Sequence, residues 1–193
     1  MNILIVASTE NEIVKFDNPN VKFLITGVGI PNTIFNLTKN IIENSYDLII
    51  NIGICGSFNS KIKIGDVVEI VEDEFSEIGF ENSDDFVKFD NEIKIESCFN
   101  VDKKTSLKSA KGITVNTVHG NEKSISEITK RLNPDVESME GAACMMVSYK
   151  FDIPFIQIRG VSNFVEKRNK DNWNMPLSIL NVNTELLKLI SQI

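Results

Sequence analysis

Short runs of consecutive apolar residues recur along the chain, separated by segments in which helices are expected. Such runs are typical of strands that are buried on both faces of a sheet. The expected strands are residues 2–7, 22–26, 47–52, 65–71, 111–118 and 154–161. The expected helices are residues 10–16, 30–43, 124–131, 138–150 and 176–193. In the segment 30–43, apolar residues at helical spacing run from Ile30 to Ile41, and Pro31 stands in the first turn, where proline is tolerated.

Strand, glycine-rich turn, helix and strand follow one another, which is the order typical of a layered α/β fold. We expect one domain over residues 1–193, a three-layer α/β/α sandwich around a mixed, twisted central sheet. Ligands in such folds bind at the carboxyl ends of strands, where we expect glycine turns at 27–29 and 53–56. The polar, acidic stretch 77–104 predicts an excursion of the chain over the surface, with a hairpin that covers the ligand site at the strand ends.

Composition and charge narrow the functional classes. The chain has 193 residues and a net charge of -7, with only three arginines and no basic stripe, so we expect no nucleic-acid partner. The three cysteines have neither disulfide nor metal spacing, which favours a reducing, cytoplasmic compartment. No apolar run is long enough to span a membrane, and no cluster of metal ligands is visible. We therefore expect a cytoplasmic protein that needs no metal or cofactor.

Three polar positions are expected to meet at one rim of the sheet. Glu12 lies just past the first strand, Glu140 opens a helix, and Asn163 follows the apolar strand that ends the core. Two carboxylates near strand ends are compatible with a hydrolase, although this pattern also occurs by chance. Glu140 has a second interpretation, because an acidic residue at a helix start also complements the helix dipole.

Four segments together resemble the nucleoside phosphorylase and nucleosidase superfamily. They are Asn51–Phe58, Lys63–Val68, Val136–Ala143 and Arg159–Asn163. The matches occur in the family's order and extend over nearly the whole chain, to about residue 180. Within the superfamily, residues 138–141 and 162–169, with Trp173 after them, resemble the futalosine hydrolases most.

The resemblance implies a role for each matching residue. Glu12 corresponds to the carboxylate that activates the attacking water, with Glu10 as the alternative two residues away. Met139 is expected beneath the ribose, Glu140 on the ribose hydroxyls, and Asn163 at the purine. The remaining contact or supporting residues are Cys55, Gly56, Arg159, Ser162 and Trp173. The family needs no cofactor or metal, binds a small purine nucleoside and commonly forms homodimers, so we expect a homodimer here.

Position 163 bears on the choice of base. Adenine-specific nucleosidases of the superfamily have Asp there, whereas an Asn amide donates one hydrogen bond and accepts another, which suits a 6-oxopurine. Hydrolysis is favoured over phosphorolysis because the loop 27–33 has no Arg for phosphate. The expected reaction is hydrolysis of futalosine to hypoxanthine, on a route to menaquinone.

Two alternatives remain open, a methylthioadenosine/adenosylhomocysteine nucleosidase and a nucleoside-binding protein without turnover. His119 has no assigned role, because a ligand contact and a hydrogen-bonded loop histidine are equally compatible with its position. The cluster of Lys167, Arg168 and Lys170 is either a solvated loop or a dock for a substrate carboxylate.

Overall fold

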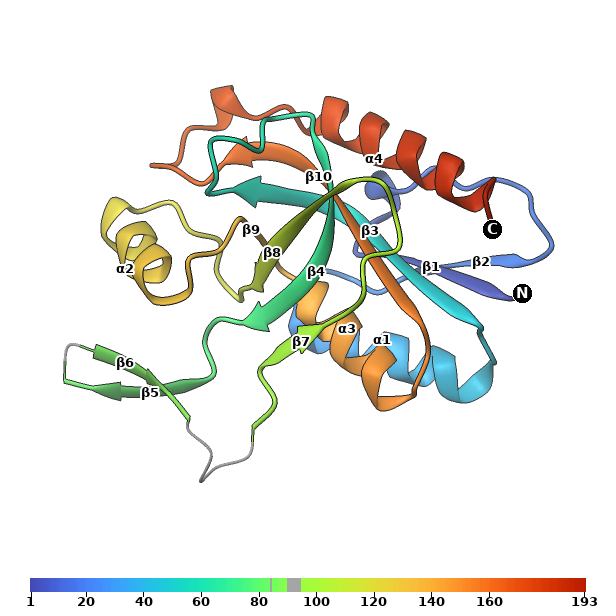
Figure 1. The fold of residues 1–193 in the computed structure, drawn as a ribbon, viewed down its shortest axis with the longest axis horizontal. Helices are drawn as coiled ribbons and strands as arrows, with labels where there is room; N and C mark the ends of the chain where they lie inside the picture. The colour runs from blue at the N-terminus through green and yellow to red at the C-terminus, as the bar shows by residue number, and fades with distance from the viewer. Residues whose placement is uncertain (84, 90–94) are drawn as a thin grey trace.

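A computed structural model describes residues 1–83, 85–89 and 95–193 (Figure 1). The strands are β1 (Ile3–Ala7), β2 (Val21–Ile25), β3 (Leu48–Ser57), β4 (Val67–Phe75), β5 (Gly79–Asn82), β6 (Asp85–Lys88), β7 (Cys98–Asn100), β8 (Lys108–Thr114), β9 (Val136–Ser138) and β10 (Phe155–Phe164). The helices are α1 (Ile30–Glu43), α2 (Glu122–Leu132), α3 (Gly141–Lys150) and α4 (Met175–Ile190), with short 3-10 turns η1 (Glu10–Glu12) and η2 (Lys170–Asn172).

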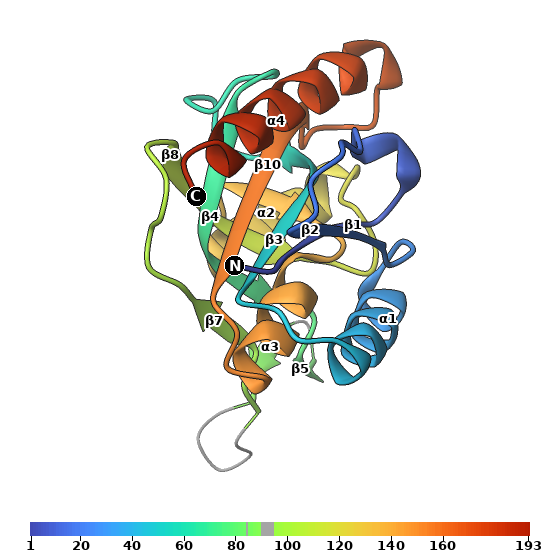
Figure 2. The same ribbon diagram turned by 90° about the vertical axis from the view of Figure 1, so that its right-hand side faces the viewer.

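The central sheet is mixed and has the order β10-β4-β8-β9-β3-β1-β2, with β7 added beside β4. Strands β1, β2, β3 and β10 run parallel, whereas β4 is antiparallel to β10 and β9 is antiparallel to β3. Strand β10 also pairs with β3, so this part of the sheet closes on itself. Helices α1 and α3 lie side by side below the sheet, and α4 lies on the opposite face (Figures 1 and 2). The layered α/β fold with a mixed sheet is confirmed.

Burial on both faces explains the continuous apolar runs. In β1, Leu4 and Val6 pack with α1 and α3, whereas Ile3 and Ile5 pack with α4 on the other face. Successive side chains of a strand point to opposite faces, so a strand covered on both sides needs apolar residues at every position. The helix predicted over 30–43 is found as α1, with the same bounds.

Some local expectations were wrong. The helix expected over 10–16 is only the three-residue η1, because Glu12 folds back to accept a hydrogen bond from the Thr9 N–H. Residues 53–56 are not a turn: β3 continues through them to Ser57, since 53–57 pair with β10 and Gly56 and Ser57 also pair with β9. The helix expected from residue 138 begins at Gly141, because 136–138 pairs with β3 and β8 as a short strand.

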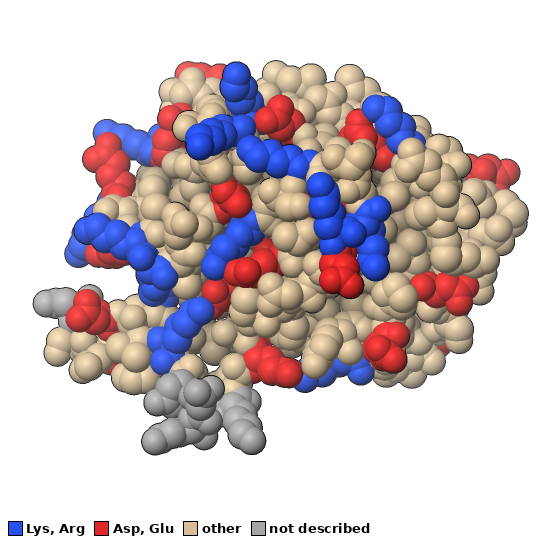
Figure 3. Space-filling view, in the orientation of Figure 1, with Lys and Arg blue, Asp and Glu red and all other residues tan. Residues whose placement is uncertain are grey.

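The excursion at 77–104 does contain a hairpin, β5–β6, but this hairpin packs against α2 rather than over the site. The guanidinium of Arg131 on α2 lies 3.8 Å from the ring centre of Phe86 on β6. The short β7 returns to the sheet beside β4. The face in Figure 3 has Lys and Arg interspersed with Asp and Glu. In the described part of the chain, no helix is long and apolar enough to cross a bilayer.

Candidate active site

A cavity of about 340 Å³ opens at the carboxyl ends of β1, β3 and β10. This volume is within the range typical of small-molecule sites. Side chains from several distant segments meet there. The residues that line it are Ser8, Thr9, Asn11, Glu12, Val28, Ile54, Cys55, Gly56, Val118, His119, Glu137, Ser138, Met139, Glu140, Ser162, Asn163, Arg168, Trp173, Met175 and Ile179.

The carboxylate of Glu12 is held by a ring of donors. Its Oε2 accepts hydrogen bonds from the Ser8 hydroxyl and from Thr9 N and Oγ1, the last two at 3.0 Å. Its Oε1 accepts one longer bond, 3.3 Å, from the Ile54 N–H. A carboxylate offers about four acceptor sites on two oxygens, so Oε1 retains a free lone pair. Glu12 can therefore accept a proton from a bound water while its orientation stays fixed.

The alternative carboxylate, Glu10, points away from the cavity. Its side chain is 67% exposed and pairs with Lys15 at 2.9 Å. The two-residue ambiguity of the sequence is thus decided by geometry in favour of Glu12 as the cavity residue.

Glu140 lies at the start of α3 and reaches across to the loop before α1. Its Oε1 accepts a hydrogen bond from the Gly29 N–H at 2.9 Å. Gly29 has φ of +90°, a conformation that L side chains rarely adopt, so glycine is needed for this amide to face the carboxylate. Burial raises the pKa of Glu140, against the opposing effects of the Arg159 guanidinium and the Gly29 N–H. This carboxylate is suited to accept hydrogen bonds from vicinal hydroxyls.

Arg159, expected among the substrate contacts, does not line the cavity. It is 2% exposed and donates a hydrogen bond of 2.5 Å to Asn51 Oδ1. A Cβ built on Gly53 would lie 2.4 Å from Arg159 Nη1 and 2.9 Å from Glu12 Oε1. Because position 53 has no side chain, the guanidinium fits beneath the site. Arg159 is therefore a buried countercharge for the carboxylates above it.

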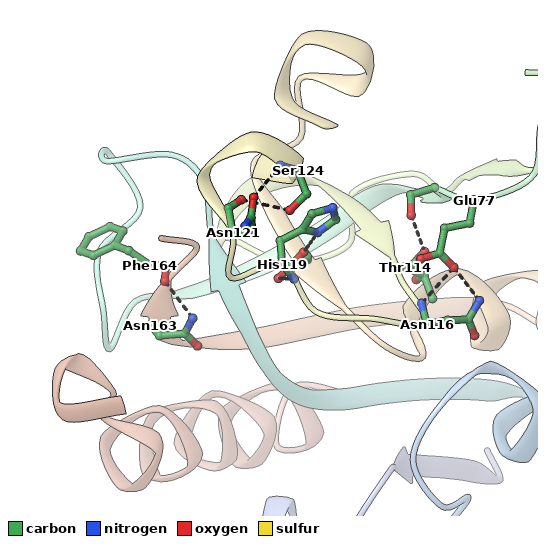
Figure 4. A network of polar contacts seen from close by, with 10 residues as sticks. Glu77, Thr114, Asn116, His119, Asn121, Ser124, Asn163 and Phe164 are labelled. Carbon is green, nitrogen blue, oxygen red and sulfur yellow. Dashed lines mark hydrogen bonds and ion pairs between the residues drawn. The ribbon is translucent and has the colours of Figure 1, made fainter. Parts of the chain in front are cut away.

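Asn163 lies near the end of β10, where Figure 4 shows its amide bonded to Phe164. Its Nδ2 donates to the Phe164 carbonyl at 2.9 Å, and its Oδ1 accepts from the Ser162 hydroxyl at 2.7 Å. Ser162 also reaches the Cys55 carbonyl at 3.1 Å. One amide hydrogen and one lone pair of Asn163 remain available to a ligand.

Cys55 lines the cavity without being a candidate nucleophile. Burial raises the pKa of its thiol to about 12, so the thiolate that reacts as a nucleophile does not form at neutral pH. Its carbonyl, not its sulfur, makes the polar contact with Ser162.

Trp173 and Arg168 approach the cavity from the segment after β10. The Arg168 guanidinium lies 5.1 Å from the centre of the Trp173 ring, within cation–π range. Arg168 lines the cavity, whereas Lys167 and Lys170 do not. Of the basic cluster, only Arg168 is therefore placed to meet a bound molecule.

Sequence reasoning missed Glu137 altogether and left His119 without a role. Glu137 is buried, and its Oε2 lies 2.6 Å from His119 Nδ1 while its Oε1 accepts the His119 N–H at 3.0 Å. An isolated acidic residue before a helix resembles a surface residue in sequence. Its burial arises from the pairing of β9 with β3 and β8, which only the folded chain shows.

The sequence-predicted residues thus fall into two groups. Those that line one cavity are Glu12, Cys55, Gly56, Met139, Glu140, Ser162, Asn163 and Trp173. Arg159 lies below it. In the described residues no group of three or more His, Cys, Asp or Glu side chains is placed to hold a metal ion.

Comparison with known proteins identifies the family to which the chain belongs. A model of the phosphorylase superfamily matches residues 9–191. The chain belongs to this superfamily. A 5'-methylthioadenosine/S-adenosylhomocysteine nucleosidase from Marinomonas sp. (strain MWYL1) is 25% identical over 186 residues, which cover 90% of this chain and 80% of that protein.

Solved structures share the fold over the full length of this chain. The native futalosine hydrolase of Helicobacter pylori strain 26695 has a TM-score of 0.86 at 14% identity and covers 100% of this chain and 98% of its own. The 5'-methylthioadenosine/S-adenosylhomocysteine nucleosidase from Helicobacter pylori with butyl-thio-DADMe-Immucillin-A has a TM-score of 0.87, the same identity and the same coverage. At such identities the likeness concerns the fold.

Proposed function

We propose that this chain is a cytoplasmic N-glycosidic bond hydrolase that cleaves futalosine to hypoxanthine and dehypoxanthine futalosine, on a route to menaquinone. The observation that carries the proposal is the distribution of polar groups in one cavity. The carboxylate of Glu12 lies near Gly53, and the carboxylate of Glu140 accepts a hydrogen bond from Gly29. The amide of Asn163 lies beside Gly56. Gly53 and Gly56 are three residues apart on β3, or about 10 Å along the strand.

This distribution matches the charges of the reaction. Breaking an N-glycosidic bond develops positive charge on the ribose ring and negative charge on the departing base. Glu12 takes a proton from water and counters the ring charge, a general-base effect that is typically about 10²–10⁴-fold. Glu140 accepts hydrogen bonds from the ribose hydroxyls above Met139. Asn163 donates to the purine, where negative charge develops.

The Gly29 N–H favours water over phosphate as the nucleophile. Backbone amides at a helix start form a common anion site, and Gly29 is the N-cap of α1. Here that amide already donates to the Glu140 carboxylate, which would repel a phosphate. A phosphorylase would instead need cationic groups at this loop. Hydrolysis therefore fits the cavity better than phosphorolysis.

The second candidate is a methylthioadenosine/adenosylhomocysteine nucleosidase, which is favoured by the similarity to the Marinomonas protein. Asn163 supports the 6-oxopurine instead, because its spare amide hydrogen and lone pair suit a base edge with N7, O6 and N1–H.

We also propose that the chain forms a homodimer, as is common in the superfamily.

A substrate panel tests the proposal. Futalosine, inosine, methylthioadenosine and adenosylhomocysteine are incubated with the purified chain, with and without inorganic phosphate, and the released base is measured by chromatography. We expect phosphate-independent release of hypoxanthine from futalosine. Preferential release of adenine would establish the second candidate, and binding without release of either base would establish a nucleoside-binding protein.

A further inference from the structure

The departing purine needs a proton that Asn163 does not supply. When the bond between C1′ and N9 breaks, the electron pair stays on the purine, and protonation of a ring nitrogen lets the base leave as a neutral molecule. A carboxylic acid that is protonated beside the base could provide this proton, but position 163 is an amide. An amide donates a hydrogen bond but does not release its proton at neutral pH. In the proposed function, the acid must therefore be another group of the cavity.

The ionisable groups that line the cavity are few. They are Glu12, Cys55, His119, Glu137, Glu140 and Arg168. Burial raises the pKa of the Cys55 thiol to about 12, so it is a poor acid at neutral pH. Arginine remains protonated and is no acid at neutral pH. Glu12 and Glu140 belong to the end of the cavity near Gly53 and Gly29. The remaining pair, His119 and Glu137, includes the side chain that ordinarily exchanges a proton near neutral pH.

Strand pairing places this pair opposite Asn163. Gly56 on β3 is aligned with Asn163 on β10 at one side and with Glu137 on β9 at the other. A Cβ at position 56 would lie 2.9 Å from Val165 Cγ2, 3.2 Å from Asn163 Nδ2 and 3.7 Å from Glu137 Cγ. Glycine at position 56 therefore lets these side chains come close together over β3. Both Asn163 and Glu137 line the cavity, so a purine that contacts Asn163 also lies near the Glu137–His119 pair.

Glu137 fixes the orientation of the His119 ring. Its carboxylate accepts a hydrogen bond from the backbone N–H of His119 at 3.0 Å and lies 2.6 Å from Nδ1 of the ring. The Phe58 ring packs edge-on against the imidazole, with ring centres 6.1 Å apart. In the part of the chain that the structure describes, no hydrogen bond involves Nε2 of His119. When a carboxylate binds Nδ1 of a histidine, Nε2 is the ring nitrogen that exchanges a proton with a ligand.

We propose that His119 donates the proton to the departing purine through Nε2 and that Glu137 is its positioning residue. The inference rests on the proposed function. Water adds to C1′ and loses a proton to Glu12, while the C1′–N9 bond breaks and its electron pair moves into the purine. The Nε2 proton of His119 passes to a purine ring nitrogen. The proton on Glu12 then returns through solvent to His119, so that the sum is one water consumed.

The test compares two leaving groups. Futalosine needs a proton on its base, whereas p-nitrophenyl β-D-ribofuranoside releases a phenolate that is stable without one. In His119→Gln we expect kcat/KM for futalosine to fall by about 10²-fold or more, with the nitrophenyl riboside changed by less than about threefold. Equal losses on both substrates would show a structural role and overturn the proposal, as would full activity on futalosine.

Glu137→Gln tests the positioning role. We expect Glu137→Gln to lower kcat/KM for futalosine by about tenfold or more while changing the nitrophenyl riboside by less than about threefold, because only the base needs the oriented His119 ring. Glu122→Gln, at the exposed start of α2, is the matched control and should keep the wild-type values on both substrates. Equal losses on both substrates in Glu137→Gln, or no loss on futalosine, would overturn the positioning role. A wild type that releases no hypoxanthine from futalosine would instead overturn the proposed function, which separates the two failures.

Discussion

Replacing Glu12 by Gln should remove the base without removing the pocket. The Gln carbonyl oxygen can occupy the Oε2 position, where the Ser8 hydroxyl and both Thr9 donors would hold it. The amide nitrogen then takes the Oε1 position and faces the Ile54 N–H, so the 3.3 Å hydrogen bond is lost. The variant keeps the shape and three of the four donors of the wild type, but its amide does not accept a proton from water.

Glu12→Gln should lose little stability but much activity. An unmet hydrogen bond of this kind costs about 1–3 kcal/mol of stability, which lowers the melting temperature by about 2–4 °C per kcal/mol for a domain of this size. Loss of a general base lowers kcat by about 10²–10⁴-fold. Because the ribose and purine contacts stay in place, KM should change little.

Steady-state kinetics with futalosine, following hypoxanthine release, measures this split, and thermal unfolding reports the stability. Glu10→Gln is the matched control, since that exposed side chain pairs only with Lys15 in the described structure and should leave kcat unchanged. A kcat of Glu12→Gln within about tenfold of wild type would refute the assignment of Glu12 as the base.

Three further predictions concern the ribose, the base and a buried acid. Glu140→Ala should lose kcat/KM by at least about tenfold on the ribonucleoside, since charge-assisted hydrogen bonds contribute about 1.5–3 kcal/mol; wild-type cleavage of the 2′-deoxynucleoside at the same rate would argue against a 2′-hydroxyl contact. Asn163→Asp should lower kcat/KM for futalosine by about ten- to hundredfold, because an ionised carboxylate would face O6; full activity would exclude a base contact. Burial raises the pKa of Asp73 from its ordinary 3.8 to about 6, opposed by hydrogen bonds from Gln157 and Thr114. Since the folded state then binds the proton more tightly than the unfolded chain, this group should make the free energy of unfolding fall as pH rises from about 4 to about 6. In denaturant titrations Asp73→Asn should remove this slope, and an identical pH dependence in both proteins would contradict it.

The sequence by itself was sufficient for the layered α/β fold and for most elements. A strand buried on both faces must be apolar at every position, and an amphipathic helix must repeat its apolar residues at helical spacing, so β1 and α1 are visible as patterns. The same residues, compared with a known family, also predicted eight of the side chains and backbone segments that line the cavity.

Local expectations failed where a long-range contact overrides a local signal. Residues 53–57 contain two glycines and a serine, which favour a turn, yet β10 pairs with the whole stretch and β9 pairs with Gly56 and Ser57 on the other side. Likewise, η1 ends early because the donors around Glu12 come from the preceding loop and from Ile54 on β3.

Only the tertiary structure decided which charged groups are brought together. It separated Glu12 from Glu10, buried Arg159 beneath Gly53, and joined Glu137 to His119. Sequence periodicity reports which face of an element is apolar, because that depends on neighbours three or four residues away. The burial of a charge depends instead on strand pairing between segments more than a hundred residues apart, as for Asn51 and Arg159. No local pattern encodes such a distance.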